Sequence, residues 1–363
     1  MSLTLVEKIA DAVLYEGYIL YPYRPSAVKN QQRWNFGALC PRSYSEAQKG
    51  TESWTMQTQC LVQTSTHVAL NVRVRFLHLL MRTVGELVPD CAMPVKECGH
   101  REFPPIGGAS HYAFVPALEV NSQVFQSWQE AVEENVQLPT IRLNSPDTTS
   151  TSQFSFSYPA SETTEPLRDE KTGNVVGILV RQRQAISGTV EVNTEQVSSE
   201  VLKITVLISN KTLLEDAGQK SRDDALLRSF VSTHTILGIQ GGEFVSLLDP
   251  PEGLHEIAGG CSNVGTYPVM VGEEGTRDCM LSSPIILYDY PQIAPESANN
   301  LYDGTEIDEI LTLRIMTLTE DEKREMRGAD ERARQLLERT ETLPMGQLMK
   351  MHGAMKSVKN RES

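Results

Sequence analysis

The sequence predicts an α+β protein that is β-rich, with mainly antiparallel, sandwich-like sheets, a few helices and a helical C-terminal segment. Two observations predict this class. Short runs in which apolar and polar residues alternate recur along the chain up to Tyr290, and this period of two is typical of strands. Beyond Gly304 the apolar residues change to near-helical spacing, and opposite charges become dense.

The bulk composition bounds the class of protein further. The chain has 363 residues, of which 40% are hydrophobic and 22% are charged, so it can bury a sizeable core. Its formal net charge of −14 argues against general binding to nucleic acid. The six cysteines are expected to be free thiols, because a protein of this size in the cytoplasm rarely depends on disulfides.

The sequence also predicts a cytoplasmic location without membrane insertion. Every uncharged apolar run is shorter than the ~18 residues that a membrane-spanning helix needs. Glu7, Lys8 and Asp11 interrupt the first apolar run, so we expect no secretion signal there.

The elements of the first 90 residues follow from local patterns. Residues 4–14 carry apolar side chains at helical spacing and predict a short helix. Residues 17–23 suit a strand that prolines end. Residues 68–76 alternate cleanly and predict a half-buried strand whose Asn and Arg side chains form a polar face, with residues 56–63 as a separate strand paired to it.

The middle of the chain is less regular. Prolines and glycines in residues 89–117 exclude long elements. Residues 122–136 place six apolar side chains on one helical face and predict an amphipathic helix. Residues 139–174 are rich in Ser, Thr and Pro, and predict a long loop or a domain junction that a short strand at 154–158 crosses.

Further strands are predicted after this loop. They lie at 175–181, 186–193, 201–208 and 285–288, with a β-hairpin from 236 to 248 that turns at Gly241 and Gly242. Ser221 is a candidate N-cap for a helix that continues to Ser229.

The C-terminal part predicts helices and then a tail. Thr305 with Asp308 and Thr319 with Glu322 each resemble a capping box, the start signal of a helix. The predicted organisation is a β-rich region at 1–303, with a division near 139–174 left open, a helical segment at 304–343 and a flexible tail at 344–363.

One block of the sequence predicts a protein-binding surface. Four tyrosines lie within nine residues from Tyr15 to Tyr23, and cations and a tryptophan follow closely. Aromatic and Arg side chains dominate recognition surfaces, but the same residues also build buried strands. The candidate partner-binding residues are Tyr23, Arg24, Lys29, Asn30, Arg33 and Trp34.

A second group of residues predicts a metal site. Cys91, Cys98 and His100 lie in a Gly- and Pro-rich stretch and carry ligands that zinc prefers. Their spacing is wider than that of a CxxC pair, so two ordinary loop cysteines beside a histidine are the alternative. A carboxylate cluster at 303–309 could bind a cation or complement a helix dipole.

Other candidate motifs favour structural roles. His255 precedes Cys261 and Ser262, but no GxSxG motif accompanies them, so a Gly-rich turn is the better interpretation. The Gly241–Gly242 and Gly259–Gly260 pairs do not extend to phosphate-binding loops.

Three long stretches together resemble a known family. They are the opening block LYEGY–LYPYR at 14–24, VSTHTIL at 231–237 with GGEFVSLLDPP at 241–251, and SPIILYDYPQIAPE at 283–296 with DGTEIDEILTLR at 303–314. The chain resembles, from about residue 12 to 340, uncharacterised bacterial proteins associated with gene clusters for oxygen-tolerant nickel–iron uptake hydrogenases. The resemblance implies no catalytic residues.

Three hypotheses for function result. The first is a non-enzymatic accessory or assembly protein without a cofactor, which binds a protein partner; the resemblance implies a hydrogenase subunit or precursor. The second is a metal-dependent enzyme or metal carrier that uses Cys91, Cys98, His100 or the carboxylates. The third is a structural subunit of a larger assembly.

Overall fold

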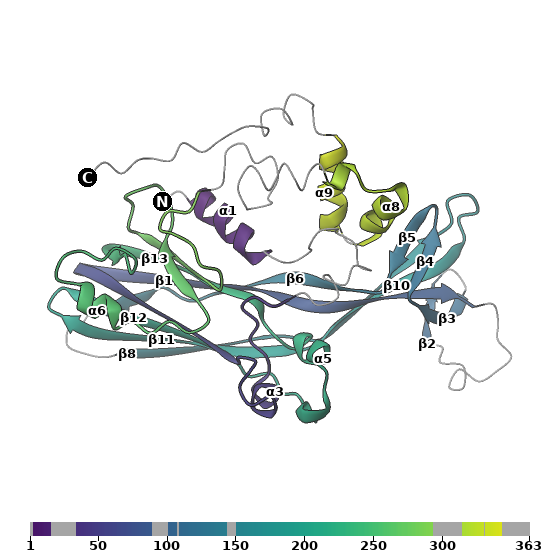
Figure 1. Cartoon of the computed structure of the whole chain (residues 1–363). Coiled ribbons are helices and arrows are strands. Elements are labelled where there is room, and N and C mark those ends of the chain that lie inside the picture. Colours follow the sequence, from purple (N-terminus) through teal and green to yellow (C-terminus); the bar gives the residue numbers. More distant parts are fainter. Residues whose placement is uncertain are drawn as a thin grey trace.

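A large, curved antiparallel sheet dominates the computed structural model (Figure 1). The structure describes residues 3–15, 34–88, 101–106, 109–143, 150–292, 314–329 and 331–342. Thirteen strands of this part of the chain form the main sheet, and β4 (Ala117–Val120) and β5 (Gln123–Gln126) form a small sheet of their own. The predicted fold class is therefore confirmed, including the few helices and the helical C-terminal segment.

Strand β1 (Thr55–Leu87) is the spine of the sheet and contains 33 residues. One side of β1 pairs in turn with β12 (Val201–Asn210), β7 (Ile141–Leu143), β6 (Trp128–Gln137) and β3 (Ala109–Val115). Its other side pairs with β13 (Val231–Val245) and then with β10 (Val175–Arg183). Residues 56–63 and 68–76 are thus consecutive parts of one strand, and the prediction that they pair with each other is wrong.

The remaining strands extend the sheet on both sides. In order of pairing, β11 (Ile186–Ser198) joins β12, β8 (Ser150–Tyr158) joins β11, β15 (Cys279–Ser283) joins β13, and β14 (Tyr267–Met270) joins β15. β9 (Ser161–Arg168) pairs with β10, and β2 (Arg101–Ile106) pairs with β3. In the left half of Figure 1, β13 and part of β1 lie above β12, β11 and β8. The main apolar core combines residues of both layers.

The sheet passes between its layers at a corner where β1 and β13 both bend. The register between these strands shifts between Thr64 and Ala69 of β1, opposite Gly242 and Gln240 of β13. Gly241 has a φ of +73°, and a Cβ on Gly242 would lie 2.9 Å from the carbonyl oxygen of Gln63. The glycine pair therefore bends one continuous strand, and the predicted hairpin at 236–248 is wrong.

Helix α1 (Leu3–Leu14) covers the sheet face that was predicted to be polar. The helix forms where predicted and packs Val6, Ile9 and Val13 against β13 and β15. Its acidic residues meet the arginines of β1, because Glu7 pairs with Arg73 and Asp11 pairs with Arg75. The apolar side of residues 68–76 is buried as predicted, but Arg75 on the other side is buried too.

The short helices are α3 (Arg42–Ala47), a 3₁₀ helix (Ala217–Gln219), α5 (Arg222–Leu226) and α6 (His255–Gly259). The predicted N-cap is confirmed, since Ser221 and Asp224 form a complete capping box at α5. The helix ends earlier than predicted.

The amphipathic helix predicted at 122–136 is wrong, since β5 and β6 occupy this segment. The physical reason lies far away in sequence. β6 pairs over ten residues with β1, and its Glu130 and Glu134 meet arginines of β1 and β10. A ladder of backbone hydrogen bonds and buried ion pairs thus outweighs the local helical periodicity.

Some of the other local predictions are confirmed, and others are wrong. Strands at 154–158, 175–181, 186–193 and 201–208 are confirmed. The stretch at 139–174 contains β7, β8 and β9 in place of a long loop, residues 101–106 and 109–115 form strands, and residues 285–288 are not a strand.

The C-terminal segment forms α8 (Glu320–Ala329) and α9 (Glu331–Glu341). Thr319 and Glu322 exchange the predicted capping-box hydrogen bonds at the start of α8. The cap at Thr305 and the tail at 344–363 lie outside the described residues, and the division into domains stays a prediction.

Candidate partner-binding surface

Trp34 is the one predicted partner-binding residue that lies within the described part of the chain, and its side chain is buried, at 5% exposure. It packs with Leu14, Leu77 and Leu79, and its indole N–H donates to Gln129 Oε1 over 3.0 Å. Its backbone carbonyl accepts a hydrogen bond of 3.1 Å from Arg222. In this conformation Trp34 stabilises the core and does not offer its ring to a partner.

The other five residues of that block, Tyr23, Arg24, Lys29, Asn30 and Arg33, lie outside the described residues. The metal-site candidates Cys91, Cys98 and His100 also lie outside them, as does the carboxylate cluster at 303–309. Both sites therefore stay predictions. Within the described residues, three or more His, Cys, Asp or Glu side chains nowhere gather in a metal-binding arrangement.

The thiols that the structure describes are poor nucleophiles. Burial raises the pKa of Cys60 and Cys40, and raises that of Cys279 to about 12. Cys261 is half-buried after the short helix α6, and burial raises its pKa as well. Because the thiolate is the reactive form, the raised pKa values lower the reactivity of these thiols at neutral pH.

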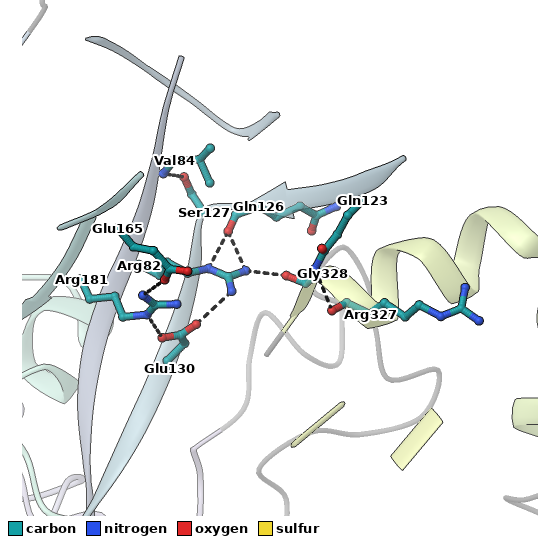
Figure 2. A network of polar contacts seen from close by, with 10 residues as sticks. All are labelled: Arg82, Val84, Gln123, Gln126, Ser127, Glu130, Glu165, Arg181, Arg327 and Gly328. Atoms are coloured by element: carbon teal, nitrogen blue, oxygen red, sulfur yellow. Dashed lines mark hydrogen bonds and ion pairs between the residues drawn. The ribbon is translucent and has the colours of Figure 1, made fainter. Parts of the chain in front are cut away.

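A network of charged side chains joins the four strands β1, β6, β9 and β10, and reaches helix α8 (Figure 2). Arg82 of β1 is 3% exposed and donates to Glu130 Oε1 over 2.9 Å and to the Gln126 carbonyl over 2.9 and 3.1 Å. Arg181 of β10 binds the other oxygen of Glu130 over 2.8 Å and Glu165 of β9 over 2.7 Å. Burial alone would lower the pKa of Arg181, but its two carboxylate partners outweigh burial and raise it.

A second buried group lies further along β1. Arg183 donates to Glu134 over 2.7 Å, and Nδ1 of His78 lies 3.8 Å from the same carboxylate oxygen, which is too long for a hydrogen bond. Burial and the charge of Arg183 lower the pKa of His78 to about 4, so the ring is neutral at pH 7. Both groups consist of internal pairs, so they act as structural links between strands.

A surface of a different kind lies after β15. In the segment 284–290, Ile285 and Leu287 pack against the core cluster that contains α1, whereas Ile286 and Tyr288 point outward with exposed fractions of 73% and 85%. Isolated exposed apolar residues are ordinary, but two large ones on a fixed backbone form a candidate contact point.

The backbone of this segment is held on both sides of Ile286 and Tyr288. On one side, Ser283 Oγ donates to the Ile285 carbonyl over 2.8 Å. Asp289 accepts hydrogen bonds from Ser246 Oγ over 2.5 Å and from the Met270 backbone N–H over 2.8 Å. Tyr290 donates its backbone N–H to the Met270 carbonyl and its hydroxyl to the Thr276 carbonyl, each over 2.8 Å. Ser246 Oγ also accepts from the N–H of Leu248, another exposed apolar residue.

The sequence held a signal for this surface. Residues 285–288 are four consecutive apolar residues, and a strand with one solvated face would place polar side chains at every second position. The apolar outward positions were therefore anomalous for the strand that we predicted there.

Comparisons with known proteins do not assign the chain to a family. No model of a known protein family matches the chain, and a search of curated proteins gave no match. The resemblance to proteins of hydrogenase gene clusters stays a prediction. None of the helices in the described residues has the length and apolar character needed to cross a membrane.

Proposed function

We propose that the protein is a non-enzymatic accessory or assembly protein that binds another protein chain through the surface formed by Ile286 and Tyr288. The observation that carries this proposal is the fixed geometry of the 284–290 segment. Asp289 and Tyr290 hold the backbone while the outward side chains remain largely exposed.

Binding at such a surface has a low free-energy cost. A partner that covers Ile286 and Tyr288 gains the burial of two large apolar side chains, worth up to about 1.5–3 kcal/mol for a fully buried side chain. Hydrogen bonds at Ile285 on one side and at Asp289 and Tyr290 on the other already order the flanking positions, so less conformational entropy is lost on binding. Tyrosine also offers a hydroxyl for a hydrogen bond at the edge of the contact.

The first partner to test is a subunit or precursor of a nickel–iron uptake hydrogenase. This choice rests on the sequence resemblance alone. The predicted block with Arg24 and Arg33 is a second candidate surface on the same chain, so the test includes variants of both.

The experiment is co-purification of co-expressed hydrogenase subunits with the tagged chain. The variant Ile286→Ser with Tyr288→Ser removes the outward apolar side chains, and Arg24→Glu with Arg33→Glu reverses the charges of the predicted block. Leu213→Ser with Met316→Ser is the matched control, because both residues are also exposed and apolar.

The proposal expects capture by the wild-type chain and the control, and at least ~10-fold weaker binding by the Ile286/Tyr288 variant. Loss of binding only in the Arg24/Arg33 variant would move the contact to the predicted block. Absence of any captured hydrogenase subunit with the wild-type chain would reject this partner.

A further inference from the structure

We propose that strand β8 pairs edge to edge, in antiparallel orientation, with β8 of a second copy of this chain, so that the two sheets form one continuous sheet across a twofold axis. This inference is independent of the 284–290 segment. It concerns the opposite end of the strand order of the main sheet, where β8 is terminal.

The open edge of β8 is the first observation. β8 pairs with β11 over nine residues, from Ser150 opposite Thr194 to Tyr158 opposite Ile186. On its other side, the described part of the chain contributes no strand and no backbone hydrogen bond. In an antiparallel ladder every second residue directs its N–H and C=O to each side, so β8 presents a row of donors and acceptors that the described residues leave unpaired.

The second observation is the chemistry of this edge. The nine residues of β8, STSQFSFSY, include no charge and no proline. Natural edge strands are commonly protected by charges, prolines or short length. The other edges follow that rule: β9 has Glu162, Glu165 and Pro166, β6 has three glutamates, and β14 has four residues including Pro268.

The third observation is that β8 is rigid and incompletely covered. Phe156 packs with Phe76 and Phe230 at ring-centroid distances of 5.9 and 5.3 Å, and a Cβ on Gly188 of β11 would clash with the Phe156 ring at 2.4 Å. Yet Phe154, Phe156 and Tyr158 are only partly buried, and β8 lies at the margin of the lower layer in Figure 1. The strand is thus fixed for pairing while its aromatic row still has surface to bury.

A second copy of β8 can pair with this edge without opposing charges. With Phe154 on the twofold axis, Phe154 faces its own counterpart and Gln153 faces Ser155 of the second copy. Every such pair is neutral, so no like charges oppose each other across the new ladder. About eight to ten backbone hydrogen bonds would form, since every second of nine residue pairs exchanges two.

The net charge of the chain opposes association. Two copies with a charge of −14 each repel one another, but at ~0.15 M salt this repulsion is screened beyond about 8 Å. The proposal therefore expects the dimer to weaken as the salt concentration is lowered.

The test is the molar mass of the full chain in solution, measured by light scattering after size-exclusion chromatography at ~50 μM, where a Kd near 1 μM leaves mostly dimer. The disruptive variant is Gln153→Lys with Ser155→Lys. Both side chains are exposed, and Glu191 lies opposite Gln153 on β11, so the introduced charge is accommodated within one chain. Across the twofold axis, however, the introduced lysines face each other.

The matched control is Ala47→Lys with Ser262→Lys, which adds the same charge at exposed positions outside β8. The proposal expects a dimer for the wild-type chain and the control, and at least ~10-fold weaker association for the β8 variant. A second variant, Gln153→Cys with Ser155→Cys, should form a disulfide-linked dimer under oxidising conditions, because facing residues lie within disulfide range.

A monomeric wild-type chain at this concentration would overturn the proposal. A dimer that persists unchanged in the β8 lysine variant would also overturn it, because the contact would then lie elsewhere. Unfolding of that variant would be detected by circular dichroism, and the cysteine cross-link then decides between pairing of β8 and no pairing.

Discussion

The guanidinium of Arg82 donates a hydrogen bond of 2.8 Å to the backbone carbonyl of Gly328, and so joins two residues that are 246 positions apart in the chain. Gly328 lies in the last turn of α8, where carbonyl groups without helical partners carry partial negative charge. A cation from the central strand therefore holds the end of this helix, as Figure 2 shows.

Replacement of Gly328 by alanine should loosen the C-terminal helices from the sheet. A Cβ at this position would lie 1.6 Å from the carbonyl oxygen of Val124, which is a backbone atom of β5 and cannot move aside freely. Overpacking of this kind costs about 1–3 kcal/mol or more. Hydrogen exchange should become faster in α8 and α9, whereas Gly259→Ala, at a position with open space, should leave it unchanged.

Removal of the Arg82 charge should destabilise the whole fold. Arg82→Met leaves Glu130 with Arg181 alone and deprives the carbonyls of Gln126 and Gly328 of their donors. Removal of one partner of a buried ion pair costs about 3–5 kcal/mol of stability. Arg82→Lys should recover only part of this stability, because an ammonium group lacks the planar set of N–H donors that a guanidinium offers.

Urea unfolding checks this expectation. The exposed pair Arg42–Glu46 provides the control, since Arg42→Ala should cost less than about 1 kcal/mol. An equal loss of stability in the Arg42 and Arg82 variants would contradict a stabilising role for the buried network.

Stability should fall as the pH drops from about 6.5 to about 4. The folded chain holds His78 and His234 neutral, with pKa values lowered to about 4 and about 3, mainly by burial. The unfolded chain protonates both near pH 6.5, so each histidine costs up to about 1.4 kcal/mol per pH unit within this window. Burial raises the pKa of Glu134, which opposes part of this trend.

The measurement is the free energy of unfolding at several pH values from 7 to 4.5. His78→Gln should make the free energy of unfolding depend less steeply on pH, because only His234 then remains as a buried histidine that folding keeps neutral. The wild-type chain, measured over the same pH range, is the control. An identical slope in the His78 variant would contradict the assigned role.

The corner of the sheet gives a further prediction. Gly242→Ala should lower the free energy of unfolding by about 1–3 kcal/mol, because its Cβ would press on the Gln63 carbonyl at 2.9 Å and on Val62 at 3.1 Å. Gly218→Ala, where open space surrounds the position, should have little effect. Thermal unfolding of the two variants checks this prediction. A lower melting temperature for Gly242→Ala alone indicates a packed strand corner, whereas equal melting temperatures would indicate a simple exposed turn at Gly242.

Local signals predicted those elements whose partners lie nearby in the sequence. Helix α1 and the Ser221 and Thr319 caps were predicted correctly, because helical spacing and capping depend on residues within a few positions. The three successive strands β10, β11 and β12 were also predicted, since each has β-branched residues between turn signals.

The candidate surface could be predicted only in part. The aromatic–basic block was identified by composition, but composition could not distinguish a recognition residue from a core residue, and Trp34 is a core residue. Ile286 and Tyr288 were assigned to an ordinary strand, because the exposure of alternate apolar side chains depends on what covers them in space.

The sequence by itself therefore determined the class of the protein: an acidic, β-rich chain with a helical C-terminal part. Only the tertiary structure decided that residues 56–76 are one strand, that β6 is not a helix, and that Arg82 holds Gly328. Each of these depends on contacts between residues far apart in the chain. Pairing with a distant strand outweighs the local preferences that a sequence reveals, and a charge can be buried only where distant partners satisfy it.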